Sequence, residues 1–216
     1  MKKIALSILI ISLSTALSYS ATLVGYDTVA STTVTPVELD PNALGINLTR
    51  GSGISAAPGG TFNSNAWNDS STLAEAITNE DYLEFGLILT PGFQASNLSA
   101  GFFGDRSATG PSSIEVFFST DNFTTQTSVL SVTDVGITGS IQDTAAIATS
   151  LTGEVRFRIY GYGGSNTSGT FDIEDTRYDG IHGLVINGDI NTIPEPSTST
   201  LIGLATLFII SRKRKS

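Results

Sequence analysis

The chain has no cysteine, and its lysines occur only near its two ends. Without cysteine it cannot form disulfides, bind zinc through thiolates or use a thiol as a nucleophile. Histidine also occurs only once, so a catalytic triad would have to use His182. No Gly-x-Ser-x-Gly sequence is present to frame a nucleophilic serine. We therefore expect His182 at a turn or strand end and predict no catalytic residue.

Basic residues are scarce in the middle of the chain. Lys2 and Lys3 lie at one end and residues 212–215 at the other, whereas residues 21–193 hold only five arginines against nineteen acidic residues, a net charge of −14. Such an acidic segment repels phosphate backbones, which argues against nucleic acid as a partner. Neutral sugars and divalent cations are better suited to it.

The N-terminus has the layout of a secretory signal peptide. Lys2 and Lys3 precede an uncharged apolar stretch over residues 4–17, and small residues follow. We predict a signal peptide over residues 1–20, cleaved between Ser20 and Ala21. The Sec translocon and signal peptidase are then expected partners. The alternative, a buried helix of a cytosolic protein, fits poorly with two lysines followed by fourteen uncharged residues.

The C-terminus has three consecutive parts. Residues 193–198 contain Pro194, Glu195 and Pro196, residues 199–211 are largely apolar and predict a short transmembrane helix, and residues 212–216 form a basic tail. The two prolines hold the first part extended. The apolar part is shorter than the roughly 20 residues that a comfortable membrane span needs. A plain tail anchor and a eukaryotic glycolipid signal are alternatives, but a glycolipid signal normally ends on its apolar stretch.

This tail resembles the PEP-CTERM sorting signal of bacteria that make extracellular polysaccharide, a motif also named after the C-termini of ice-binding proteins. The resemblance implies that an exosortase-type membrane protease recognises Pro194, Glu195 and Pro196 and removes the anchor. It also implies passage through the cell envelope of a Gram-negative-type bacterium to the cell surface or the extracellular matrix.

Residues 21–192 predict one all-β domain, a jelly-roll or β-sandwich. Residues 154–160 alternate strictly, with Val155, Phe157 and Ile159 on one face. Other short apolar segments alternate with clusters rich in Gly, Pro, Asn, Asp and Ser, as in a sandwich. The one helix expected is short and begins near Thr72, where Glu75 completes a capping box. Three pieces resemble the jelly-roll passengers found ahead of such tails: residues 81–85 with 89–92, residues 106–111 with 116–119, and residues 155–160 with 169–173.

Two features of this domain suit sugar binding, which uses flat aromatic rings beside planar hydrogen-bonding groups. Arg156, Arg158 and Tyr160 share the polar face of the alternating strand, and Trp67 lies in a polar loop. We predict these four as ligand contacts. The alternative is that the arginines pair with nearby carboxylates and that Trp67 closes one end of the sandwich.

Acidic residues crowd one stretch of the sequence, namely Asp172, Glu174, Asp175 and Asp179. Calcium prefers several oxygen ligands from such a loop, so structural Ca²⁺ is the one metal that we consider. The alternative is a solvated strand face followed by an acidic turn. We predict no cofactor and no defined metal site.

These patterns together predict a non-enzymatic component of the cell surface or extracellular matrix, with extracellular polysaccharide as its expected ligand. The alternative is an exported enzyme that acts on polysaccharide, a glycoside hydrolase or lyase. Such an enzyme needs two carboxylates flanking a cleft, and nineteen scattered acidic residues neither establish nor exclude such a pair.

Overall fold

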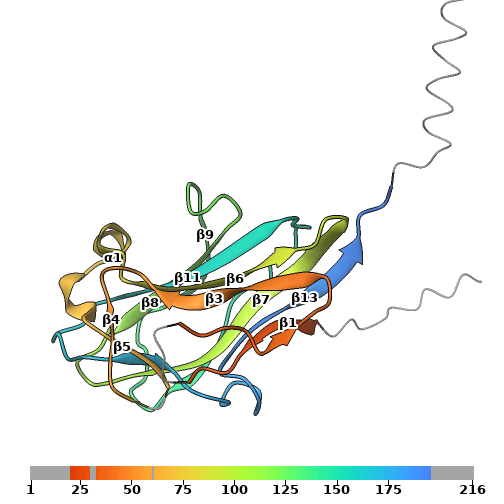
Figure 1. The fold of residues 1–216 in the computed structure, drawn as a ribbon. Coiled ribbons are helices and arrows are strands. Elements are labelled where there is room, and N and C mark those ends of the chain that lie inside the picture. The colour runs from red at the N-terminus through yellow and green to blue at the C-terminus, as the bar shows by residue number, and fades with distance from the viewer. Residues whose placement is uncertain (1–19, 30–32, 60, 196–216) are drawn as a thin grey trace, which may run out of the picture.

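The computed structural model describes residues 20–29, 33–59 and 61–195. Thirteen strands in this part form two sheets, and every strand pair is antiparallel. The sheets lie face to face as the two layers of a sandwich (Figure 1). The predicted all-β sandwich is thus confirmed.

The larger sheet has eight strands in the order β2-β1-β13-β7-β12-β5-β4, and β10 pairs with β7 outside this order. Its longest strand, β7, contacts three others. The bounds are β1 Ala21–Tyr26, β2 Glu38–Leu39, β4 Ser55–Ala56, β5 Phe62–Asn65, β7 Phe93–Arg106, β10 Ser140–Asp143, β12 Phe171–Ile173 and β13 Leu184–Thr192.

The smaller sheet has five strands in the order β3-β6-β11-β8-β9. Their bounds are β3 Ala43–Arg50, β6 Tyr82–Leu89, β8 Ser113–Ser119, β9 Thr127–Val132 and β11 Glu154–Tyr162. The central strand, β11, contains residues 154–160, whose apolar and polar side chains alternate. As predicted, Val155, Phe157 and Ile159 are buried against the other sheet.

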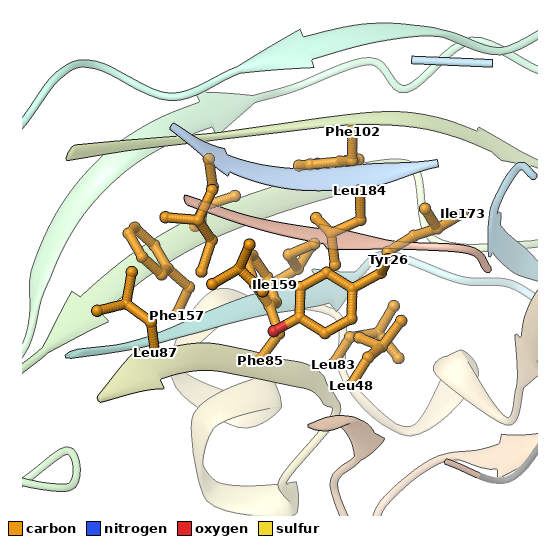
Figure 2. Packing of buried hydrophobic residues seen from close by; sticks show 14 of the residues in the cluster. Tyr26, Leu48, Leu83, Phe85, Leu87, Phe102, Phe157, Ile159, Ile173 and Leu184 are labelled. Carbon is orange, nitrogen blue, oxygen red and sulfur yellow. The ribbon is translucent and has the colours of Figure 1, made fainter. Parts of the chain in front are cut away.

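The core fills the space between the two sheets. Figure 2 shows Phe102 and Leu184 of the larger sheet with Leu87, Phe85 and Phe157 of the smaller one. The rings of Phe85 and Phe157 stack at 5.4 Å between centroids. Apolar residues at alternate strand positions therefore hold the sheets together without disulfides.

Tyr26 places a polar group inside this core (Figure 2). The register between β3 and β6 slips by one residue between Ile46 and Thr49, which interrupts the ladder beside Gly86. The Tyr26 hydroxyl donates toward the carbonyl oxygens of Ile46, at 2.6 Å, and Gly86, at 3.1 Å. It also accepts a hydrogen bond from the Gly86 amide. The buried hydroxyl thus forms hydrogen bonds with backbone groups beside the bulge, where the strand ladder is interrupted.

Two short helices precede β6: the 3-10 helix η1 (Trp67–Asp69) and α1 (Leu73–Asn79). The predicted capping box is present, because Thr72 accepts from the Glu75 amide while the Glu75 side chain accepts from the Thr72 amide. Among the residues that the structure describes, no helix reaches the length and hydropathy needed to cross a membrane. The predicted signal peptide core and C-terminal apolar helix lie outside those residues.

Candidate functional site

The outward-facing side of the five-stranded sheet brings together the polar residues that alternate with the core. We call it the outer face. Its central rows follow from strand register: Glu84 of β6 lies beside Arg158 of β11, and Arg158 lies beside Phe117 of β8. Because side chains alternate along a strand, the next outward row holds Tyr82, Tyr160 and Glu115.

An ion-pair network runs along this face. Arg158 Nε lies 2.7 Å from one carboxylate oxygen of Glu84, and Arg156 Nη1 lies 2.5 Å from the other. Arg156 Nε also pairs with Glu154. The Glu84 side chain is only 12% exposed, less than either of its arginine partners. The three side chains therefore hold one another in place at the centre of the face.

Aromatic rings enclose the guanidinium group of Arg158. Its central carbon lies 4.0 Å from the ring centroid of Tyr82 and 3.9 Å from that of Phe123. Burial by itself lowers the pKa of Arg158, but hydrogen bonds with Tyr160 and Glu84 outweigh it and raise the pKa above its usual value. The charged, stacked group is thereby fixed in orientation.

Phe123 reaches the face from the loop between β8 and β9, which rises above the sheet in Figure 1. Asp121 organises this loop: its carboxylate accepts hydrogen bonds from the Thr125 amide, the Thr125 hydroxyl and the Ser119 hydroxyl. Those bonds, led by that of the Thr125 amide, lower the pKa of Asp121. The loop that carries Phe123 is therefore held by local hydrogen bonds.

Two of the four predicted ligand contacts are buried, contrary to the expectation that they would be exposed. Trp67 is 0% exposed. Its Nε1 donates to the Ser64 carbonyl at 2.8 Å, and its ring meets Phe171 edge-on at 5.9 Å. Tyr160 is also buried, between the rings of Tyr82 and Phe117. Neither ring can stack on a sugar in this arrangement.

Arg156 and Arg158 do lie on the outer face, but paired with carboxylates. The alternative interpretation of these residues thus describes the structure better. Sequence reasoning also missed Tyr82, Glu84, Phe117 and Phe123. The signal for Tyr82 and Glu84 was available, because Leu83, Phe85 and Leu87 alternate and leave their neighbours facing outward. Phe123, in a loop, gave no such signal.

His182 lies just before β13 and is buried. Its Nδ1 is 2.9 Å from Asp179 and its Nε2 is 3.3 Å from Glu38. A side chain on Gly25 would collide with the imidazole ring, so Gly25 leaves the room that the ring occupies. His182 thus joins β2 to the loop between β12 and β13.

The acidic residues that crowd the sequence separate into three places. Asp172 and Glu174 meet Asp105 of β7, and one oxygen of each lies within 4.8 Å of the others. Burial, together with the hydrogen bond and charge of Asp172, raises the pKa of Asp105 to about 7. Asp175 instead contacts Asp27, and Asp179 binds His182. Structural Ca²⁺ thus stays the one metal considered, with no defined site predicted.

The two ends of the described chain leave the sandwich together (Figure 1). Ala21 begins β1 and pairs with Gly188, while β13 continues to Thr192. The Ile193 amide donates to the Gly92 carbonyl at 2.8 Å, so Pro194 and Glu195 follow the last strand directly. Pro196 lies outside the described residues. Ser20 and Ala21 are both exposed at the predicted cleavage point.

The solved structures that are similar to this chain include two with a loose likeness. No family model matches the chain, and no curated protein matches it. A solved structure of TmCBM61 in complex with β-1,4-galactotriose is 16% identical and covers 62% of this chain and 74% of its own, with a TM-score of 0.30. The N-terminal cellulose-binding domain of Cellulomonas fimi β-1,4-glucanase C is 11% identical and covers 73% and 93%, with a TM-score of 0.32. At these values the likeness does not say what this chain binds.

Proposed function

We propose that this protein is an exported surface or matrix component whose jelly-roll-like domain binds extracellular polysaccharide without cleaving it. The observation that carries the proposal is the outer face, where the Arg158 guanidinium is stacked between Tyr82 and Phe123 and tied to Glu84. A sugar ring has apolar faces and a polar rim, so its binding site needs both kinds of group side by side. The outer face supplies both.

The arrangement also favours binding because its polar groups are already fixed. An arginine held by a carboxylate and two rings loses little further freedom when a ligand arrives. The Glu84 oxygens accept from Arg156 and Arg158, and Glu115 accepts from Ser128. Glu154 pairs with Arg156 as well. These contacts engage the three acidic side chains of the network and its neighbouring row in bonds within the sheet, which supports a binding role over the rival role of a polysaccharide-cleaving enzyme.

Retention on immobilised polysaccharide, with polymer length followed by size-exclusion chromatography, tests this proposal. The protein purified from the producing cells should be retained on its matrix polysaccharide and should leave the chain length unchanged. Phe123→Ala should weaken retention about tenfold, because it removes one of the two stacking rings. Phe103→Ala is the matched control: Phe103 also has an arginine, Arg177, over its ring, but lies on the other sheet.

If incubation with the protein shortens the polymer, the binding proposal is wrong and the protein is a polysaccharide-cleaving enzyme. Equal loss of retention in Phe123→Ala and Phe103→Ala would move the binding site away from the outer face.

For sorting, we propose that the signal peptide is removed before Ala21 and that an exosortase-type protease then acts at Pro194, Glu195 and Pro196. The exposure of Ser20 and Ala21 supports the first step, since a peptidase needs an accessible bond. Mass spectrometry of the mature protein from a host with its sorting protease should find no peptide from residues 212–216. If most molecules still carry residues 212–216, the proposed processing is wrong and the C-terminal segment is a simple tail anchor.

A further inference from the structure

An exposed aliphatic strip adjoins the ion-pair network on the outer face. Leu44 of β3 pairs with Ile88 of β6, and Ile88 pairs in turn with Glu154 of β11. Leu44 is 63% exposed and Ile88 is 37% exposed. In the next outward row, Ile46 lies beside Gly86 and Gly86 beside Arg156. A chain bound along the network would therefore reach these aliphatic side chains.

Branched aliphatic side chains suit a different part of a saccharide from aromatic rings. An aromatic ring offers a flat surface and π electrons to the face of a pyranose. Leucine and isoleucine offer neither, but they gain free energy by covering apolar groups such as methyl. The aliphatic strip therefore fits a substituent that ends in a methyl group better than it fits a bare sugar ring.

The charges on the outer face argue against an acidic polymer. The ion-pair network on this face contains two arginines, Arg156 and Arg158. Both already have carboxylate partners, supplied by Glu84 and Glu154. Glu115 adds a further negative charge on the same face. The surrounding domain is strongly acidic as well, with nineteen acidic residues against five arginines over residues 21–193. A polyuronate would meet repulsion and find no unpaired arginine in the network.

We propose that the ligand of the outer face is a neutral polysaccharide carrying O-acetyl groups, with the sugar rings beside Arg158 and the acetyl methyl groups on Leu44 and Ile88. This inference rests on the proposed polysaccharide binding and specifies its ligand class. It assigns the aliphatic strip a role in selectivity, separate from the affinity supplied by the aromatic rings.

The test compares three probes on the protein purified from the producing cells: an O-acetylated glucomannan, the same polymer after mild alkaline deacetylation, and a polyuronate. Affinity electrophoresis should show the acetylated polymer bound about fourfold more tightly than the deacetylated one for each methyl group buried. The polyuronate should bind least. The double variant Leu44→Thr/Ile88→Thr, which keeps branched strand residues, should bind the two glucomannan forms equally.

Ile181→Thr is the matched control, because Ile181 is 66% exposed but lies in the loop before β13. It should keep the preference for acetyl groups. If the protein binds both glucomannan forms equally, or binds the polyuronate best, the ligand class is wrong while polysaccharide binding stands. If none of the three probes nor the matrix polysaccharide is retained, the proposed function itself fails. Thermal unfolding of each variant confirms that it is folded before binding is measured.

Discussion

Replacing Trp67 with alanine is expected to lower the free energy of unfolding by about 3–5 kcal/mol. The ring is 0% exposed, meets Phe171 edge-on, and contributes a hydrogen bond from its Nε1 to Ser64. It also lies directly against Gly161 of β11, so it connects η1 to the five-stranded sheet. Truncation would leave a cavity that the two sheets cannot readily close. Equilibrium denaturation in urea, followed by circular dichroism, measures the loss.

Trp67→Phe is the control, because it keeps an aromatic ring and loses the indole hydrogen bond and part of the volume. It should cost about 1–2 kcal/mol. Trp67 is the only tryptophan, so the fluorescence of the wild-type protein reports on this site alone. Its emission should be that of a buried indole and should not change when polysaccharide saturates the outer face. A Trp67→Ala protein of unchanged stability that has lost polysaccharide binding would return Trp67 to the ligand contacts.

Replacing Glu84 with glutamine is expected to destabilise the protein by about 2 kcal/mol. The change leaves Arg158 without its carboxylate partner and Arg156 with Glu154 alone. Pairs exposed to solvent contribute less than about 1 kcal/mol, whereas breaking a fully buried pair costs about 3–5 kcal/mol. Glu84 lies between these limits because its side chain is 12% exposed. The same urea denaturation measures this loss.

Glu154→Gln is a matched control, because Glu154 also pairs with Arg156 but is 39% exposed. Its loss should stay below about 1 kcal/mol. Polysaccharide retention should fall in Glu84→Gln, since Arg158 is no longer held between its partners, and should stay near the wild-type value in Glu154→Gln. Equal effects of the two substitutions on stability and retention would show that the network does not organise the face around Glu84.

Local patterns predicted much of the fold. The alternation of Val155, Phe157 and Ile159 predicted β11 and the direction of its faces, because strand periodicity depends on neighbouring residues only. Thr72 and Glu75 predicted the start of α1 for the same reason, since a capping box is completed within four residues. The shortest strands, such as β2 and β4, cannot be predicted in this way. Two-residue strands have no periodicity to detect and exist only because a neighbour pairs with them.

The candidate site was harder to predict because its members come from separate strands. Arg156 and Arg158 were placed on the correct face, but their partner Glu84 lies more than seventy residues earlier in the chain. Tyr160 obeys the same alternation and is nevertheless buried, because Tyr82 and Phe117 of the adjacent strands flank its ring. Periodicity gives the face to which a side chain points, whereas its exposure depends on what covers that face.

The sequence by itself determined the acidic character of the domain, the absence of thiol chemistry, the predominance of strands and the layout of the two terminal segments. These properties follow from composition and from residues close together in the chain. Only the tertiary structure decided that Trp67 is a core residue, that Asp105 joins Asp172 and Glu174, and that Glu84 holds both arginines. Each of these depends on strand order and register, which bring distant residues within a few ångströms of one another.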